Sequence, residues 1–302
     1  TNTMLHLPAI AHECGIELSF DMANEISART PNLCHLAPAG DTYMEDLERA
    51  GGVYAVMAEL AQAGLLDTGT LTCTGRTVAE NLEGVVNRNE EIIRPLDNPY
   101  SRTGGIAVLK GNLAPDGCVV KTAGVPPEIW KFRGPALVVD SQEQAIEVIL
   151  NDTLKPGMAL VIRYEGPKGG PGMQEMLYPT SFVKGKGIGK QVAMLTDGRY
   201  SGGSSGLAIG HMAPEAANKG PVALIKNGDI IDIDIEARSV NVELTDEQLD
   251  ERRRELEAGD GYVAHRNRHV SQALKAYAAF ARSADKGATR DPELINKLSG
   301  LN

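Results

Sequence analysis

The chain has 302 residues, of which 42% are hydrophobic and 23% charged, a composition typical of globular proteins that excludes a disordered chain. Its net charge of -10 argues against nucleic acid or an anionic membrane surface as the main partner, because both favour clustered Lys and Arg. No run reaches the roughly 18 apolar residues of a membrane-spanning helix, and the first residues lack the basic segment of a signal peptide. We therefore expect a cytoplasmic protein with room for two domains.

The cysteines also indicate a reducing compartment. Cys14, Cys34, Cys73 and Cys118 are widely spaced and form no Cys-x-x-Cys pair. Free thiols in the cytosol are the expected state. A metal cluster built from these four alone has no support from their spacing.

The first 97 residues are predicted to be helical. Residues 4–14 carry apolar side chains at a helical period and stop at Gly15. Residues 51–63 form a second periodic segment of small side chains, which Gly64 closes. This part of the chain is therefore expected to be α-rich.

Two capping boxes and a polar connection support this division. Thr42 and Glu45, like Thr77 and Glu80, have the spacing in which a threonine and an acidic side chain cap the start of a helix. Residues 87–100 are polar and contain two prolines, which predicts a loop or a linker.

Beyond Ser101 the pattern changes to strands. Two strands at residues 106–109 and 119–121 should flank a turn at 112–117. Further short apolar segments predict strands at 137–139, 159–163, 192–195 and 229–235, the last one after an Asn227-Gly228 turn.

Helices are interspersed with these strands. Ser141 and Gln144 should cap one helix, and Thr245 and Gln248 another that continues to Glu257. A final amphipathic helix is expected over residues 270–284. The sequence thus predicts an α/β protein in which residues 1–97 are α-rich and residues 98–302 form a β-barrel-like domain with short helices.

One segment with chemical potential is residues 163–176 (RYEGPKGGPGMQEM), which follows a strand. Its glycines and prolines are costly to order, so tight backbone geometry or a close ligand is expected. A helix should begin near Met173, placing Glu175 in its first turn. There the carboxylate could simply complement the helix dipole, or it could face an ion.

A second segment is residues 195–206 (LTDGRYSGGSSG). Ser201 loosely resembles a serine-hydrolase nucleophile after a strand, but Arg199 stands where that motif needs glycine, and the next histidine is His211. An anion-binding nest of backbone N–H groups is the stronger alternative.

Several charged side chains have more than one interpretation. Arg163, Lys168 and Arg199 could each bind a substrate carboxylate or be solvated surface charges. His265 and His269 are four residues apart and could share a helix face, but two histidines do not make a metal site, and solvated helix residues are preferred.

At these two loops the sequence resembles the family of dihydroxy-acid and sugar-acid dehydratases, and the resemblance covers the whole chain. Further matching motifs are residues 44–53 (MEDLERAGGV), 111–124 (GNLAPDGCVVKTAG) and 209–216 (IGHMAPEA). The loop from Glu165 to Glu175 is more similar to the branched-chain dihydroxy-acid enzymes than to phosphogluconate dehydratases. Pentonate dehydratases are harder to separate from it.

The resemblance implies roles for particular residues. Glu175 falls on the family's magnesium ligand and Ser201 on its proposed general base, while Tyr200 replaces a more usual Phe. Family members are about twice as long, and their iron–sulfur cysteines and other magnesium ligands precede the segment that this chain matches. The four cysteines here fall on none of those motifs.

The resemblance also implies a fold and an activity. Residues 1–97 would be the C-terminal part of an N-terminal α/β domain, and the barrel-like domain would be similar to the swivelling domain of aconitase-type enzymes. The activity would be Mg²⁺- and Fe–S-dependent dehydration of 2,3-dihydroxy acids to 2-keto acids in valine and isoleucine biosynthesis, by a homodimer. Magnesium and the amides of Gly202 and Gly203 would make the Ser201 hydroxyl basic.

Two alternatives stay open. The chain could belong to a pentonate or other sugar-acid dehydratase, or it could be a catalytically inert, anion-binding or interaction module.

Overall fold

A computed structural model describes residues 1–201 and 203–300. The chain forms two compact units, one made of Thr1–Ala23 with Ile106–Asn302 and the other of Asn24–Gly105. We describe each unit by itself. The predicted domain boundary at residue 97 remains a prediction, since the compact units divide the chain at other points.

The unit from Asn24 to Gly105 is helical, as predicted for this region. It contains most of α2 (Phe20–Arg29), followed by α3 (Met44–Ala50), α4 (Gly52–Gln62) and α5 (Val78–Leu82). Its small core consists of Leu47, Ala50, Ala55 and Ile93. Residues 87–100 form neither helix nor strand, which confirms the predicted loop.

The starts of the helices in this unit show which helix caps can be predicted from neighbouring residues. Thr77 caps α5 as predicted, since its side chain accepts a hydrogen bond from the Glu80 N–H. The prediction of a capping box at Thr42 and Glu45 is wrong, because the cap lies one residue later. The Asp46 carboxylate accepts the Tyr43 N–H at 3.0 Å, so α3 begins one residue later. Helix α2 was not predicted.

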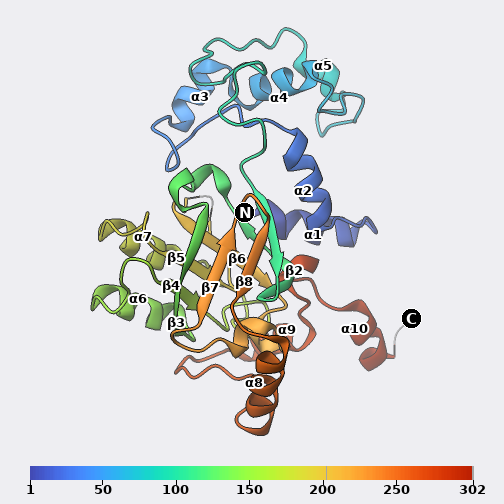
Figure 1. The fold of residues 1–302 in the computed structure, drawn as a ribbon. Coiled ribbons are helices and arrows are strands. Elements are labelled where there is room, and N and C mark those ends of the chain that lie inside the picture. Colours follow the sequence, from blue (N-terminus) through green and yellow to red (C-terminus); the bar gives the residue numbers. More distant parts are fainter. Residues whose placement is uncertain (202, 301–302) are drawn as a thin grey trace. The chain divides into compact units, whose positions relative to one another are not determined.

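The second unit is built on a closed eight-stranded barrel (Figure 1), which confirms the predicted barrel-like domain. Its strands are β1 (Ala107–Gly111), β2 (Ala114–Val120), β3 (Lys131–Val139), β4 (Ala159–Ile162), β5 (Ala193–Thr196), β6 (Leu207–Ala213), β7 (Ile230–Asp234) and β8 (Ser239–Val242). Around the barrel their order is β1-β2-β6-β5-β4-β3-β7-β8.

The pairing places the candidate loops. Strands β3, β4, β5 and β6 run parallel to one another, whereas β2 pairs antiparallel with β6 and β7 with β3. Because β4 and β5 are adjacent and parallel, the segments that follow Ile162 and Thr196 leave the barrel at the same end.

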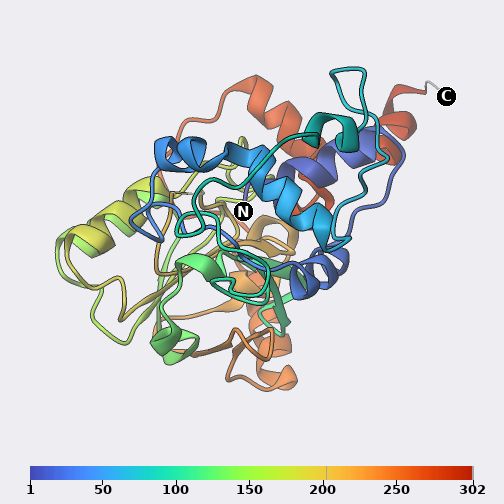
Figure 2. The ribbon, with the colours of Figure 1, turned by 90° about the horizontal axis from the view of Figure 1, so that it is seen from above.

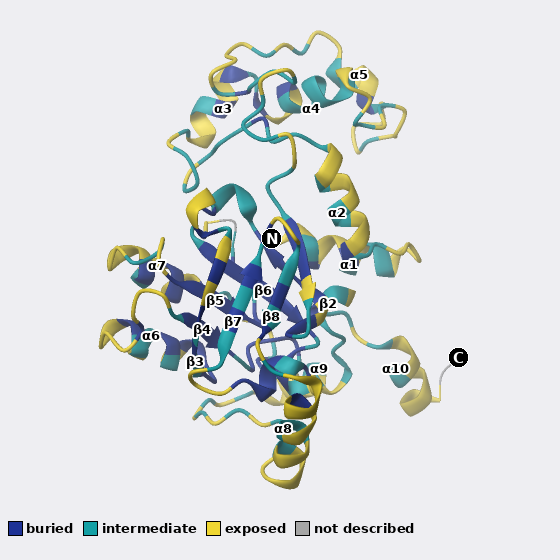
Figure 3. Cartoon of the chain, viewed as in Figure 1, coloured by how far each residue is buried: buried dark blue, intermediate teal, exposed yellow. Residues whose placement is uncertain are grey.

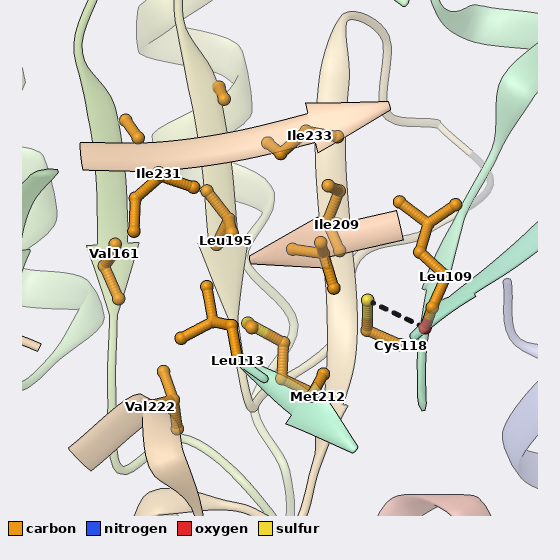
Figure 4. Close-up of a cluster of buried hydrophobic side chains, with 14 of the residues drawn as sticks. Leu109, Leu113, Cys118, Val161, Leu195, Ile209, Met212, Val222, Ile231 and Ile233 are labelled. Carbon is orange, nitrogen blue, oxygen red and sulfur yellow. Dashed lines mark hydrogen bonds between the residues drawn. The ribbon is translucent and has the colours of Figure 1, made fainter. Parts of the chain in front are cut away.

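Apolar side chains fill the barrel interior. Figure 3 shows the strands as the most buried part of this unit, and Figure 4 shows side chains from opposite walls meeting, among them Leu109, Val161, Leu195, Ile209 and Ile231. The thiol of Cys118 lies in this core and donates to the Leu109 carbonyl. All four cysteines are free, as expected.

Two helices cover the outside of the parallel strands. α6 (Gln142–Leu150) and α7 (Leu177–Gly185) pack against each other, side by side in Figures 1 and 2. A second apolar cluster lies between them and the sheet. Ser141 caps α6 as predicted, accepting from the Gln144 N–H.

The remaining helices are peripheral to the barrel. They are α1 (Thr3–Glu13), α8 (Asp246–Ala258), α9 (Gln272–Phe280) and α10 (Pro292–Ser299), with 3₁₀ turns η1 (Thr122–Gly124), η2 (Pro127–Ile129), η3 (Ala216–Asn218), η4 (Pro221–Leu224) and η5 (Ala284–Lys286). The Thr245 cap of α8 is confirmed. The predicted final helix is shorter than expected, because it ends at Phe280, and α10 was not predicted. Among the described residues, no helix combines the length and apolarity that crossing a bilayer requires.

Some strand predictions were also wrong. β2 begins at Ala114, so the turn is confined to Asn112 and Leu113, and Gly117 lies within the strand beside an irregularity in its pairing. The Asn112 side chain fixes this short turn by donating to the Val242 carbonyl and accepting from its N–H. Strands β6 and β8 were not predicted.

Candidate functional site

The loop after β4 holds Glu175 differently from the sequence expectation. The helix begins at Leu177 rather than near Met173, so Glu175 lies before its first turn. Glu175 instead forms an isolated parallel bridge with Arg199, and the Met176 N–H donates to the Arg199 carbonyl at 2.9 Å. The helix-dipole interpretation of Glu175 is therefore wrong, and the bridge brings the loops after β4 and β5 together.

Arg199 is engaged within this junction. Its Nε donates to the Met173 carbonyl at 2.8 Å, and a terminal nitrogen lies 3.4 Å from the Glu175 carboxylate. The Glu175 side chain stays 30% exposed, so the carboxylate is held at the surface of the loop. Arg199 thus positions Glu175, and any role in binding a substrate remains a prediction.

Ser201 lies two residues beyond this bridge. Its Oγ accepts a hydrogen bond from the Gly203 N–H at 3.0 Å, and its carbonyl accepts from both the N–H and the hydroxyl of Ser204. A donor aimed at the oxygen favours negative charge on it. Gly202, whose amide was expected to act in the same way, lies outside the described residues.

A serine-hydrolase arrangement is not formed in the described part of the chain. His211 is fully buried, and neither ring nitrogen has a hydrogen-bond partner among the described residues. Burial lowers its pKa to about 3, helped by the positive charge of Arg199. In the part of the chain that the structure describes, no histidine therefore bonds to Ser201.

Beneath the two loops, Asp197 holds three segments together. Its buried carboxylate accepts the backbone N–H groups of Tyr164 at 3.0 Å, Glu165 at 2.8 Å and Ala216 at 2.9 Å. Burial raises its pKa to about 6, although these three donors oppose the rise. This residue was missed, because an acidic side chain after a strand carries no local sign of burial.

Glu215 performs a similar task for the glycine-proline loop. Its carboxylate accepts the Lys168 N–H at 2.8 Å and the Gly169 N–H at 2.8 Å. Burial, and then the nearby Asp197, raise the pKa of Glu215 to about 7. In the sequence, the segment 209–216 stands out only because it resembles the family. In the structure it contacts both loops, which explains why the three segments occur together.

A third buried acid, Glu165, ties the loop to the C-terminal segment. Arg268 donates to both of its carboxylate oxygens, at 2.7 and 2.6 Å, and Arg266 lies 3.2 Å away. The Gln142 N–H donates to the same carboxylate at 2.7 Å. None of these partners is near Glu165 in sequence, so no local pattern indicates this network.

The backbone is strained where these segments meet. Tyr164, Met173 and His211 all adopt left-handed conformations, with φ of 59°, 48° and 58°. A Cβ on Gly198 would come 2.9 Å from the Cβ of Glu165, so that position requires glycine. The surroundings must hold these conformations, which is typical of functional loops.

The other predicted cations and histidines lie elsewhere. Arg163 is paired with Asp140 at 2.7 Å and donates to the carbonyls of Ala223 and Ile225, so it is structural. The Lys168 ammonium is 3.4 Å from the Asn218 side chain. His265 and His269 lie in an irregular segment, and the prediction that they share a helix is wrong.

The described residues do not make a complete metal site. They contain no group of three or more His, Cys, Asp or Glu side chains that could hold a metal ion. Glu175 fits as a single oxygen ligand for magnesium, because its carboxylate is partly exposed and is held only by a 3.4 Å contact. The cysteines do not fit an iron–sulfur cluster.

Two surface hollows lie away from Glu175 and Ser201. One, of about 580 Å³, is lined by the end of α1, the following turn and the start of β2. Another of the same volume lies beside Asp140, Arg163 and Arg252. Neither includes Glu175 or Ser201, so the candidate site rests on the contacts of its loops.

Most of the chain matches two known protein families. Residues 91–288 match the family described as "Dihydroxy-acid/6-phosphogluconate dehydratase C-terminal", and residues 1–81 match the corresponding N-terminal family. The two matches together span both compact units.

Individual relatives agree with this assignment. The chain is 68% identical over 341 aligned residues to the dihydroxy-acid dehydratase of Bifidobacterium longum subsp. infantis, covering 100% of this chain and 55% of that protein. It is 62% identical to the Bifidobacterium adolescentis dihydroxy-acid dehydratase with the same coverage, and 56% identical to the Clostridium kluyveri one, covering 95% of this chain and 51% of that protein. The chain thus spans about half the length of these relatives, and it belongs to the dihydroxy-acid/6-phosphogluconate dehydratase family.

Proposed function

We propose that the chain acts as part of a longer hydro-lyase that dehydrates 2,3-dihydroxy carboxylic acids to 2-keto acids in branched-chain amino-acid biosynthesis. The observation that supports this proposal is the bridge between Glu175 and Arg199, because Arg199 precedes Ser201 by two residues. The identity to dihydroxy-acid dehydratases over the whole chain supports the same substrate class.

In the proposed reaction Ser201 removes a proton from C2. That proton is weakly acidic beside a carboxylate, and a serine hydroxyl is a weak base, so the oxygen must be stabilised as an anion. The Gly203 N–H, 3.0 Å from Oγ, supplies part of that stabilisation. As the C2 proton moves to the anionic Oγ, the C2–C3 double bond forms and the C3–O bond breaks. Oγ then returns this proton to the departing hydroxide, which leaves as water, and the serine anion is restored. The resulting enol then becomes the keto acid.

The role of Glu175 is to hold a cation where charge develops. Magnesium, when bound in the whole enzyme, would neutralise charge on the substrate as the proton leaves. Glu175 would contribute one oxygen to it, and Arg199 would orient that carboxylate. The remaining magnesium ligands and the cluster cysteines would come from the rest of the enzyme, as would its homodimeric assembly. A cytoplasmic location is part of the same proposal.

The test is a serine substitution in the full-length enzyme. Ser201→Ala should lower kcat by about 10²- to 10⁴-fold with metal content unchanged, because general-base catalysis contributes that much. Turnover of 2,3-dihydroxyisovalerate and of a pentonate would be followed by keto-acid formation. Ser181→Ala, at an exposed serine of α7, is the matched control and should be neutral. Normal turnover by Ser201→Ala would remove Ser201 from the mechanism, and faster turnover of the pentonate would reassign the substrate.

A further inference from the structure

Lys121 follows the last residue of β2, and the structure places its side chain beside the turn that carries Ser201. A Cβ built on Gly124 would lie 2.9 Å from Cε and 3.6 Å from Nζ of Lys121, and 3.5 Å from the Ser204 carbonyl oxygen. The Lys121 ammonium and the Ser204 carbonyl oxygen therefore both lie close to the position that a side chain on Gly124 would occupy. Lys121 was not among the cations that the sequence singled out.

Backbone hydrogen bonds fix this proximity. The Gly206 N–H donates to the Gly124 carbonyl at 2.9 Å, and the Gly124 N–H donates to the Lys121 carbonyl at 3.0 Å. Ser204 in turn donates to the Ser201 carbonyl through its N–H at 3.2 Å and its hydroxyl at 2.8 Å. These hydrogen bonds hold the end of β2 against Gly206, two residues after the Ser204 that bonds to Ser201.

The electrostatic environment of Lys121 suits an anion. The side chain is about half buried, and burial lowers its pKa. An ammonium that has lost part of its hydration gains from an incoming negative charge more than a solvated one does.

The three cations considered from the sequence lie on the loops after β4 and β5. Arg163 binds Asp140 and two carbonyls, Lys168 lies against Asn218, and Arg199 binds Glu175 and the Met173 carbonyl. Among the described residues, Lys121 is the lysine that approaches the Ser201–Ser204 turn from β2.

We propose that the ammonium group of Lys121 binds the carboxylate of the acid substrate beside Ser201. This rests on the proposed function, and it names the residue that would present C2 of the substrate to the serine oxygen. A 2,3-dihydroxy acid has its carboxylate attached to C2, so an anchor next to the base holds the reacting carbon close to it.

Steady-state kinetics of the full-length enzyme test the proposal. Lys121→Met should raise the KM for the dihydroxy acid about 10- to 100-fold, because a charge-assisted hydrogen bond is lost, while kcat falls less. Lys121→Arg should recover most of the affinity. Lys131→Met, which removes an exposed lysine on β3, is the matched control and should leave KM unchanged.

Two kinetic outcomes would overturn the proposal. An unchanged KM in Lys121→Met would show that the ammonium does not bind the substrate. A fall in kcat with unchanged KM and a shifted pH profile would show that Lys121 acts on the Ser201 oxygen instead.

A labelling experiment separates this proposal from the proposed function. In the wild-type enzyme, the 2-keto acid product should protect Lys121 from acetylation, measured by mass spectrometry, and leave Lys131 unprotected. An enzyme that dehydrates no dihydroxy acid would contradict the proposed function, yet protection of Lys121 would still support its role in binding the carboxylate. Equal labelling of Lys121 with and without the acid would reject that role.

Discussion

Glu215 is a single side chain whose protonation is linked to the stability of the fold. Its carboxylate is buried against the backbone of Lys168 and Gly169, and its pKa is about 7 in the folded chain against an ordinary value of 4.5. Because the folded pKa is raised, the stabilisation linked to protonation is fully present below about pH 4.5 and is lost as the pH rises through 7.

Replacing this carboxyl group should remove that dependence. The unfolding free energy of the wild-type chain minus that of Glu215→Gln is expected to fall by about 2–3 kcal/mol between pH 4.5 and 7.5. Urea denaturation at a series of pH values would measure the difference. A flat difference for Glu215→Gln would mean that its pKa is not raised.

At the scale of elements, the ion pairs of Glu165 hold the C-terminal segment against the loop after β4. Arg268→Met would leave that buried carboxylate with Arg266 as its remaining arginine partner. We expect a loss of about 2–4 kcal/mol in unfolding free energy, together with faster hydrogen exchange over residues 262–271.

An exposed ion pair provides the control for Arg268→Met. Arg253 pairs with Asp250 on the surface of α8, so Arg253→Met should change stability by less than about 0.5 kcal/mol. Equal effects of the two substitutions would show that the Glu165 pairs do not hold the segment.

Local signals predicted the elements whose ends are set by neighbouring residues. The caps at Ser141, Thr77 and Thr245 were found because a hydroxyl and the N–H three residues later belong to the same turn. The start of α7 was placed too early, since the hydrogen bond from Met176 to Arg199 keeps Glu175 extended, and Arg199 is distant in sequence.

The candidate site was predicted only in part, because some of its features are local in sequence and others depend on distant residues. The glycine-rich composition of the two loops indicated where chemistry is concentrated, and the structure brings those loops together. The acids beneath them, Asp197 and Glu215, bond to backbone groups of segments far along the chain. Such tertiary contacts leave no periodic pattern in a single sequence. β6 was missed because it is buried along its whole length, so its sequence shows no alternation of apolar and polar residues.

At the scale of the whole molecule, Glu175 is the ligand that we propose from this chain for a metal that needs several. Full-length enzyme carrying Glu175→Gln should require more Mg²⁺ for half-maximal activity, because a carboxylate ligand becomes an amide. The 302-residue chain alone should bind Mg²⁺ more weakly than about 1 mM, since its described residues provide no cluster of three ligands. Calorimetric titration would measure this affinity, and a micromolar dissociation constant would show that the chain holds a complete site.

The parallel pairing of β4 and β5 determines where the chain should tolerate changes in sequence and length. The connection between them passes over the outer wall through α7, while the residues after Ile162 and Thr196 emerge next to each other. Lengthening or remodelling the chain between Leu177 and Gln191 would alter the wall and leave the origins of both loops in place. Relatives can therefore diverge in that crossover without disturbing where Asp197 meets Glu165.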